Sequence, residues 1–409
     1  MITNTQTLTV LWSVNKGDNM SNKYGNDTDS NIRPAGHGDR RAFMYGNEVV
    51  VRAALAAKAE FLYGYPITPQ NEIMHYWSRL APAQGGKFLQ TEDELSAGFA
   101  TLGGIMAGAR SFSATAGPGT VLFQEPLSMA EMMRIPIVLI VQQRGGPSTA
   151  TVIYSQQEVF LAIFGGNGEG LRVVYSPGGH QEMYDYTIKA FDTAWRYRFP
   201  TLVLGDGYQA KMREPVVLYD PEERGMQLQP AVPFVGGEGV PGVEREPAHW
   251  RNAFSVEEEL FEALQPIIHD FQHAAPFLTE MEASDLEGAE IIVTGHGIVG
   301  RSAREAVREL RAGGVPAGFF RPLTLRPFPA KDLKRILDSC PRLLVVESAQ
   351  GQLTKLFRIA IGGELEHRVE MYPYFRPGLG ITAEEIAREV RAILGGERKE
   401  EARAAVSIL

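Results

Sequence analysis

Short β-branched runs that end at glycine-rich loops alternate with helical patterns along most of this chain. The clearest run is RIPIVLIVQQ at residues 134–143, which is followed by Arg144-Gly145-Gly146-Pro147. A continuous apolar run of this kind is typical of a strand that is buried on both faces of a parallel sheet. Parallel strands need long crossover connections, which the helical segments between the runs can supply. The alternation therefore predicts an α/β fold with a doubly wound sheet.

The patterns fall into two groups along the chain. In the first group, helical spacing covers residues 47–62, 91–108 and 182–196, and short strand patterns cover 109–116, 134–143 and 200–205. A proline- and glycine-rich stretch at 230–247 and a helical segment at 255–274 lead to a second α/β group from about residue 287. We therefore expect a polar extension at 1–40, a first domain at 41–235, a linker and helical connection at 236–285, and a second domain at 286–409.

Charge and cysteine content exclude several classes of function. The 409-residue chain has a net charge of −9, which argues against a nucleic-acid or anionic-membrane partner. No apolar run approaches the roughly 18 residues of a membrane span, and the polar start does not look like a signal peptide, so we expect a cytoplasmic protein. The single cysteine, Cys340, leaves no intrachain disulfide and no cysteine-ligated iron–sulfur cluster on this chain alone. Electrons from any redox reaction would leave through another polypeptide.

Chemistry-bearing residues gather where strand patterns end. The short aromatic strand before Pro66 runs into Pro66-Ile67-Thr68-Pro69, so two prolines restrict the backbone around Thr68. Glu94 opens a helical pattern, and Arg144 follows the buried run. Ligands of open parallel sheets bind at the carboxyl ends of strands, which predicts a site formed by these loops.

Each of these residues also has a purely structural interpretation when it is considered alone. Thr68 could cap the next helix, and Glu94 could complement the dipole of its helix together with Glu92 and Asp93. Arg144 could be a surface charge at a strand end.

Several motifs, taken in order, resemble a known family. GYPITP, TEDELSAG, SATAGPG, VQQRGGPST and LGDGYQAKMREP resemble the alpha subunit of 2-oxoacid:ferredoxin oxidoreductases, of the 2-oxoglutarate type without a fused gamma domain. GHGIVG, FRPLTLRPFP and VVESAQGQL are similar to the second domain of that family. The resemblance covers roughly residues 43–395. It implies a thiamine-diphosphate-binding, pyrimidine-type doubly wound domain followed by a transketolase-C-terminal-like α/β domain.

The resemblance also implies the reaction and its participants. A 2-oxoacid is oxidatively decarboxylated to an acyl-CoA and carbon dioxide, with coenzyme A as co-substrate. The alpha subunit covers the aminopyrimidine of thiamine diphosphate, whereas a beta subunit holds the diphosphate, its Mg²⁺ and a 4Fe–4S cluster. Gamma and ferredoxin-like delta subunits are further partners, and ferredoxin or another acceptor takes the electrons. No metal ligand is expected on this chain.

Site roles follow from the resemblance position by position. Glu94 matches the glutamate that hydrogen-bonds pyrimidine N1′, where a carboxylate stabilises the imino tautomer that activates the thiazolium ring. Thr68 matches the threonine that contacts the oxo or carboxylate oxygens of the substrate, and Arg144 matches the arginine that binds its 2-carboxylate. Pro66, Gly117 and Gly119 lie in the matching cofactor-binding loops.

The segment after RGGPST departs from relatives that use 2-oxoglutarate. Tyr154 stands where those relatives commonly have a lysine, and Gln156 where they have a glutamate. Loss of a lysine that would neutralise a distal carboxylate favours an uncharged side chain, as in phenylglyoxylate or 2-oxoisovalerate, although 2-oxoglutarate stays open. Tyr154 could form an aromatic wall for the substrate, or it could merely pack within its loop.

Two alternative functions remain open. GHGIVG at residues 295–300 lies between a strand and a helix, as a dinucleotide-binding loop does, and Arg321 ends the next strand, where an arginine favours the 2′-phosphate of NADP. The chain could thus be an NADP-binding electron-transfer subunit. It could also be a non-catalytic paralogue that serves only assembly.

Two further patterns indicate structure rather than a metal site. Gly205-Asp206-Gly207 opens the thiamine diphosphate metal motif, but the asparagine that would complete it is missing, so Asp206 is expected at a strand-end turn. His269 and His273 are expected on a helix surface, because a metal site would require a third ligand.

Overall fold

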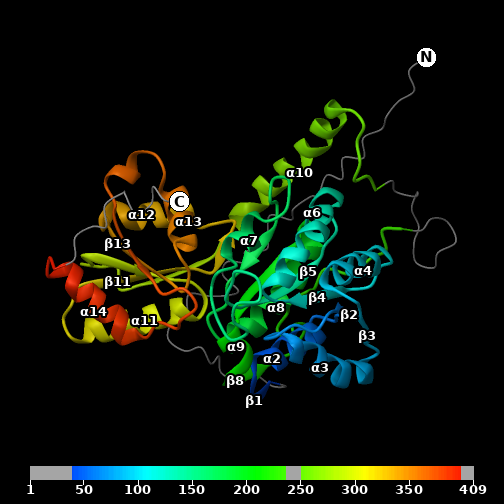
Figure 1. Ribbon diagram of the computed structural model, residues 1–409, viewed down its shortest axis with the longest axis horizontal. Helices are drawn as coiled ribbons and strands as arrows, with labels where there is room; N and C mark the ends of the chain where they lie inside the picture. Colours follow the sequence, from blue (N-terminus) through cyan, green and yellow to red (C-terminus); the bar gives the residue numbers. More distant parts are fainter. Residues whose placement is uncertain (1–38, 236–249, 398–409) are drawn as a thin grey trace. The chain divides into compact units, whose positions relative to one another are not determined.

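The computed structural model describes residues 39–235 and 250–397, and the figures show these parts in colour (Figure 1). Nearly all of the expected extension at 1–40 and the first part, 236–249, of the expected linker and helical connection at 236–285 lie outside these ranges.

A seven-stranded sheet organises the first half of the chain. Its strand order is β12-β6-β7-β5-β4-β2-β3, and every neighbouring pair is parallel except β12 with β6. The strands are β2 (Phe61–Gly64), β3 (Lys87–Gln90), β4 (Ser111–Thr115), β5 (Val138–Gln143), β6 (Val173–Tyr175), β7 (Thr201–Asp206) and β12 (Thr324–Arg326). This topology confirms the predicted doubly wound parallel sheet.

Helices cover both faces of this sheet. They are α2 (Gly46–Ala56), α3 (Asn71–Leu80), α4 (Glu94–Met106), α5 (Pro118–Leu122), α6 (Gln124–Met133), α7 (Val159–Phe164), α8 (His180–Tyr197) and α9 (Gly207–Lys211), with a 3₁₀ turn, η1 (Ala81–Gln84). A separate antiparallel pair joins β1 (Arg40–Tyr45) to β8 (Arg213–Leu218).

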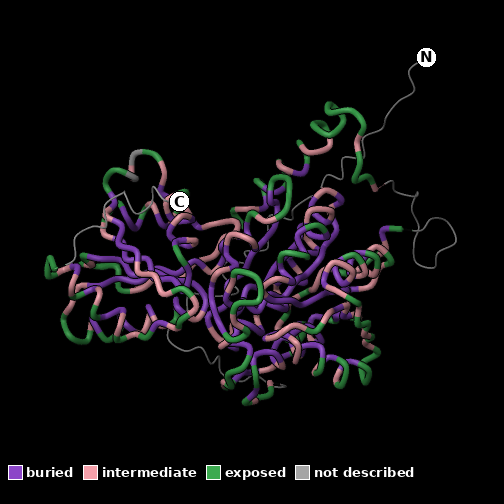
Figure 2. The backbone as a smooth tube through the Cα atoms, viewed as in Figure 1, coloured by how far each residue is buried: buried purple, intermediate pink, exposed green. Residues whose placement is uncertain are grey.

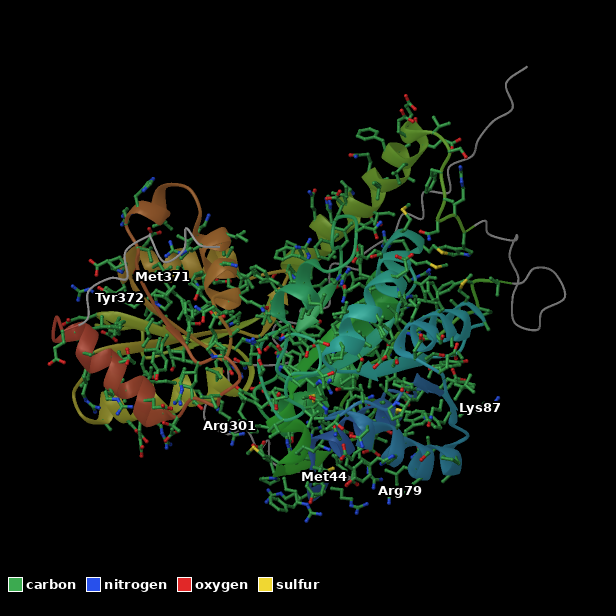
Figure 3. The ribbon with its side chains drawn as sticks, in the orientation of Figure 1. Met44, Arg79, Lys87, Arg301, Met371 and Tyr372 are labelled. Atoms are coloured by element: carbon green, nitrogen blue, oxygen red, sulfur yellow. The ribbon has the colours of Figure 1, made fainter. Side chains whose placement is uncertain are left out.

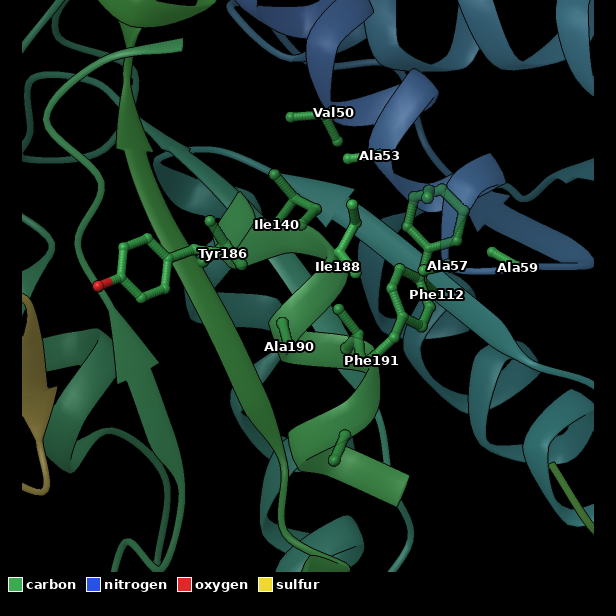
Figure 4. Packing of buried hydrophobic residues seen from close by; sticks show 14 of the residues in the cluster. Val50, Ala53, Ala57, Ala59, Phe112, Ile140, Tyr186, Ile188, Ala190 and Phe191 are labelled. Carbon is green, nitrogen blue, oxygen red and sulfur yellow. The ribbon is translucent and has the colours of Figure 1, made fainter. Parts of the chain in front are cut away.

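Strand β5 shows why its sequence lacks polar alternation. Val138 and Ile140 enter one hydrophobic core, whereas Leu139 and Val141 enter another. Figure 4 shows the first core, in which Ile140 lies among side chains of α2 and α8. Because both faces of the strand are buried, every position favours an apolar residue.

A five-stranded sheet organises the second half, in the order β14-β13-β10-β11-β9. The strands are β9 (Met281–Ser284), β10 (Ile291–Thr294), β11 (Ala317–Pro322), β13 (Arg342–Glu347) and β14 (Glu370–Phe375). The helices around it are α11 (Gly297–Ala312), α12 (Ala330–Ser339), α13 (Gln352–Ile361) and α14 (Ala383–Leu394), with a 3₁₀ turn, η2 (Glu364–His367). The connecting helix α10 (Glu257–Leu278) packs instead on the core of the first half, where its Phe271 contacts Phe199. Figure 2 shows that buried residues follow the strands of both sheets.

The two sheets share a core and a buried ion-pair network. Leu139 of β5 and Phe320 of β11 belong to one hydrophobic cluster. Arg321 of β11 is buried and its Nη2 contacts Glu182 of α8 at 2.6 Å and Glu282 of β9 at 2.9 Å. Arg301 of α11, marked in Figure 3, pairs with Glu214 of β8, which is 15% exposed at the side chain. The second half of the chain is therefore firmly joined to the first.

The structure corrects two predicted boundaries. The helix expected at 47–62 ends at Ala56, because the chain turns through Lys58 at φ 60° and pairs Phe61 with the neighbouring strands instead. The strand expected from residue 134 begins at Val138, because Arg134 adopts φ 55° as the cap that ends α6. The strands that the sequence analysis did not predict are β1, β3, β6, β8, β9, β12 and β14. Several of them, such as β9 with four residues and β12 with three, give too short a pattern to distinguish from a loop.

Candidate functional site

The loops that follow β2, β4 and β5 meet at one edge of the seven-stranded sheet. These strands are parallel neighbours in the order β5-β4-β2, so their carboxyl ends lie together. Thr68 follows β2, Gly117 and Gly119 follow β4, and Arg144 follows β5. The structure thus brings together the loops that the sequence predicted to form a site.

Arg144 links two of these loops directly. It is 5% exposed, and its Nη1 donates a hydrogen bond to the backbone oxygen of Thr68 over 2.8 Å. Gly117 lies at φ 55°, and a Cβ placed on it would be 2.6 Å from Nε of Arg144. Only glycine allows the loop to pass this close to the guanidinium. Nε itself is buried without a hydrogen-bond partner among the described residues.

Glu94 is the first residue of α4, and the structure separates it from its acidic neighbours. Asp93 caps the helix by accepting a hydrogen bond from the Ser96 backbone over 2.7 Å, and Glu92 is exposed. Glu94 is only 4% exposed. Burial raises the pKa of its carboxyl above the ordinary value. Its own backbone N–H and, more weakly, Arg144 lower the pKa, but they do not offset the effect of burial.

One carboxylate oxygen of Glu94 is left without a partner. Its Oε1 is buried and makes no hydrogen bond to any described residue. A Cβ on Gly119 would be 2.4 Å from this oxygen and 2.1 Å from Oγ1 of Thr115, which is also buried without a partner. An unpaired buried carboxylate oxygen is costly, so its retention points to a polar group supplied from outside the chain.

Thr68 does not cap the following helix. The cap residue of α3 is Gln70, so Thr68 is not a helix cap, although it lies in the turn before α3 as its structural interpretation expected. Thr68 is half-buried, and the described part of the chain provides no hydrogen-bond partner for its hydroxyl. Pro66, two residues earlier, is exposed.

Glu158 is a site residue that the sequence analysis missed. It is buried, and its Oε1 accepts hydrogen bonds from the backbone N–H groups of Gly117, over 2.9 Å, and Arg144, over 3.0 Å. Its Oε2 accepts the hydroxyl of Thr120 over 2.5 Å. The carboxylate thus joins the loops after β4 and β5. The only signal in the sequence was an acid directly before the apolar segment of α7, which does not distinguish a buried acid from a surface one.

Tyr154 is packed rather than open to a ligand. It is 1% exposed and its ring stacks on Tyr208 of α9, with centroids 4.1 Å apart and planes at 6°. Burial raises the pKa of its hydroxyl well above the ordinary value. This arrangement is the one that the packing alternative expects, and a role in substrate binding stays a prediction.

The GHGIVG loop lies between a strand and a helix as expected, but the side chain of Gln156 already packs against it. It follows β10 and α11 begins at Gly297. The side-chain amide of Gln156 donates to the backbone oxygen of His296 over 2.9 Å, and a Cβ on Gly297 would be 3.0 Å from the same amide nitrogen. Arg321, which the NADP alternative requires, is held by Glu182 and Glu282. The geometry therefore disfavours a dinucleotide here.

Asp206, His269 and His273 make up the remaining candidate metal patterns. Asp206 caps α9 by accepting hydrogen bonds from the backbones of Tyr208 and Gln209, each over 3.0 Å, as the turn interpretation expected. His269 and His273 are exposed on α10. Within residues 39–235 and 250–397, no three potential metal-ligating side chains come together. In the same ranges no helix has both the length and the hydrophobicity to cross a bilayer.

Comparisons with protein families match both halves of the chain. Residues 52–274 match the family described as pyruvate flavodoxin/ferredoxin oxidoreductase, thiamine diP-binding. Residues 289–386 match the family described as pyruvate:ferredoxin oxidoreductase core domain II.

Individual relatives show the same similarity. The 2-oxoglutarate synthase subunit KorA of Methanothermobacter marburgensis is 32% identical over 78% of this chain and 91% of its own length. The ketoisovalerate oxidoreductase subunit VorB of the same organism is 31% identical over 86% of this chain and 97% of its own length. Among solved structures, the 2-oxoglutarate:ferredoxin oxidoreductase from Magnetococcus marinus, with 2-oxoglutarate, coenzyme A and succinyl-CoA bound, aligns with a TM-score of 0.75 and 28% identity over 86% of this chain and 65% of that one. The resemblance and fold class inferred from the sequence are confirmed.

Proposed function

We propose that this chain, which belongs to the 2-oxoacid:ferredoxin oxidoreductases as an alpha-type subunit, holds the aminopyrimidine of thiamine diphosphate against Glu94 and the 2-oxoacid against Arg144 and Thr68. The reaction is the oxidative decarboxylation of a 2-oxoacid to an acyl-CoA and carbon dioxide. The observation that carries the assignment of the site is the buried, unpaired Oε1 of Glu94 beside Gly119.

Glu94 fits a proton-sharing role. Its raised pKa lets Oε1 hold or share a proton with a ring nitrogen, which a fully solvated glutamate would do poorly near neutral pH. When bound, thiamine diphosphate supplies the nucleophilic carbon and the electron sink that decarboxylation of a 2-oxoacid requires. Gly119 leaves no side chain beside the carboxylate, and Gly117 and Pro66 lie in the same loops.

Arg144 and Thr68 fit the recognition of a 2-oxoacid. The guanidinium is nearly buried and its Nη1 is fixed on the Thr68 backbone, so little freedom is lost when a carboxylate binds to the rest of the group. The unused hydroxyl of Thr68 can donate to an oxo or carboxylate oxygen of the same substrate.

A partner subunit fits the face on which the site lies. Apolar side chains are exposed on the site-bearing elements: Val121 (58%) and Leu122 (43%) of α5, Phe99 (38%) of α4, and Ile153 (62%) in the loop after Arg144. Exposed apolar surface around an incomplete site is typical of a subunit interface. We assign it to a beta subunit that carries the diphosphate, Mg²⁺ and a 4Fe–4S cluster, since the only cysteine here, Cys340, is buried.

The family to which the chain belongs also suggests gamma and ferredoxin-like delta subunits as partners, with ferredoxin as the electron acceptor. We propose that the complex works in the cytoplasm.

The substrate we propose has an uncharged side chain. Residues 145–158, which follow the carboxylate-binding arginine, contain no lysine or arginine and expose Val152 and Ile153. A second substrate carboxylate would find no cation in this loop, whereas a branched or aryl group would find apolar contacts. 2-Oxoisovalerate and phenylglyoxylate are therefore favoured over 2-oxoglutarate.

Reconstitution tests this proposal. The chain is co-expressed with the beta, gamma and delta subunits encoded with it, and 2-oxoacid- and coenzyme A-dependent reduction of ferredoxin is measured with 2-oxoisovalerate, phenylglyoxylate and 2-oxoglutarate. We expect activity that is fastest with one of the first two. Preference for 2-oxoglutarate would refute the substrate assignment alone. No activity with any 2-oxoacid, or micromolar binding of NADPH, would favour one of the alternative functions.

A further inference from the structure

The first residue of α13, Gln352, reaches from the five-stranded half of the chain to the loop before α7. Its side-chain amide nitrogen donates to the backbone oxygen of Gln157 over 2.7 Å. Its side-chain oxygen accepts the backbone N–H of Phe160 over 3.0 Å. One side chain thus holds the backbone on both sides of Glu158.

Glu158 connects the segment held by Gln352 to the loops of the candidate site. Its carboxylate holds the backbone N–H groups of Gly117 and Arg144, the two residues that pack against each other beside the site. Its own backbone N–H donates to the side chain of Gln143 at the end of β5 over 3.2 Å. Gln157 adds a second connection, because its side-chain oxygen accepts the backbone N–H of Gly146 over 3.1 Å.

The start of α13 is itself rigidly held. Glu347, at the end of β13, is buried and accepts hydrogen bonds from the backbones of Leu353 over 2.8 Å and Thr354 over 2.9 Å. The next residue, Ser348, accepts the backbone N–H of Gln156 over 3.2 Å. The VVESAQGQL segment is therefore held in place by hydrogen bonds, and the loop at 154–158 is hydrogen-bonded to it.

We propose that Gln352 is a positioning residue for substrate binding, because its two hydrogen bonds to Gln157 and Phe160 fix Glu158 and, through it, the loops of Gly117 and Arg144. This inference rests on the proposed function of Arg144. It gives the five-stranded half of the chain a part in setting the site geometry, although Gln352 touches neither substrate nor cofactor.

The experiment compares three variants in the reconstituted complex. Gln352→Met keeps the length of the side chain but removes both hydrogen bonds, and Gln352→Glu keeps only the acceptor for Phe160. Ile359→Ser, at a 65% exposed position on the same helix, is the control. With 2-oxoisovalerate as substrate we expect the KM of Gln352→Met to rise about tenfold while the KM for coenzyme A and kcat stay within about twofold. The KM of Gln352→Glu for 2-oxoisovalerate should lie between those of the wild type and Gln352→Met.

Hydrogen exchange of the chain gives a readout that does not depend on activity. We expect amide protection at Gly117 and Arg144 to fall about tenfold in Gln352→Met and to stay unchanged in Ile359→Ser. Unchanged protection, or a KM increase that is equal for both substrates, would overturn the inference. A wild-type complex that oxidises no 2-oxoacid, combined with lost protection in Gln352→Met, would instead refute the proposed function and leave the mechanical link standing.

Discussion

Gly119 and Glu94 approach each other so closely that a single added methyl group at residue 119 would lie 2.4 Å from Oε1 of the glutamate. The two residues come from different elements, α5 and α4. Oε1 of the glutamate is buried without a partner within the described chain, and only a glycine lets the backbone at residue 119 approach it this closely. Under the proposed function, this unpaired oxygen is the atom that meets the ring nitrogen of the cofactor.

The first prediction tests this close approach. Gly119→Ala should lower the apparent affinity of the complex for thiamine diphosphate at least tenfold, because the new Cβ would press on Glu94 and on Thr115, 2.1 Å away. The affinity is measured by titrating the cofactor-free complex and following activity. The control is Gly103→Ala in α4, where a Cβ meets nothing within 4 Å. It should leave affinity unchanged and stabilise the helix by about 0.5–1 kcal/mol.

The second prediction concerns the charge on Glu94. Glu94→Gln should reduce activity of the complex at least a hundredfold, because an amide cannot share a proton with a ring nitrogen as a carboxyl does. The same change should stabilise the isolated chain at neutral pH. The pKa of Glu94 is raised in the folded state, so the wild type loses stability as pH rises through that value, whereas the glutamine variant does not.

Thermal unfolding between about pH 4 and pH 8 measures the difference. Glu92→Gln, at the exposed neighbouring acid, is the matched control and should change neither activity nor the pH dependence. A Glu94→Gln chain that is less stable than the wild type at pH 7 would contradict the unpaired, buried carboxylate.

The third prediction separates the shape of Glu158 from its charge. Glu158→Ala leaves the N–H groups of Gly117 and Arg144 and the hydroxyl of Thr120 without their acceptor, which should destabilise the chain by about 3 kcal/mol. Glu158→Gln should cost less than about 1 kcal/mol. Its oxygen can still accept both backbone bonds, and its amide can donate to the Thr120 hydroxyl, which reverses direction.

Urea unfolding of both variants gives these free energies, and the KM for 2-oxoisovalerate reports the effect on Arg144. We expect that KM to rise about tenfold in the alanine variant and to change little in the glutamine variant. Equal losses in the two variants would mean that the negative charge, rather than the hydrogen bonds, holds the loops.

The contrast between Arg144 and Glu158 shows what the sequence could predict here. Arg144 was predicted because a continuous apolar strand fixes where its carboxyl end lies, and parallel strands bring such ends together. Glu94 was distinguished from Glu92 and Asp93 only by family resemblance, yet in the structure its burial alone separates it.

The contacts that sequence reasoning missed join residues that are far apart in the chain. Glu158 binds residues 14 and 41 positions away, and Gln352 binds residues 192 and 195 positions away. No local pattern encodes such pairings. Tyr154 has the packing that one of its two sequence interpretations expects, because its ring stacks on Tyr208 and is removed from solvent, and its contact with a substrate stays a prediction.

The last prediction concerns acid stability at the junction between the two sheets. Burial alone would raise the pKa of Glu182, but the Arg321 guanidinium and the backbone N–H of Gly178 lower it below the ordinary value. A lowered pKa means that the carboxylate of Glu182 stabilises the fold at pH values above its ordinary pKa, and that this contribution is lost as pH falls through its pKa in the folded state.

Glu182→Gln should therefore lower the midpoint of thermal unfolding at pH 7 and weaken the decline of that midpoint below about pH 4. Glu305→Gln removes an exposed ion pair with Arg308 on α11, and it should change neither the unfolding midpoint at pH 7 nor its decline in acid. If the two variants behave alike, the buried pair does not hold the junction together.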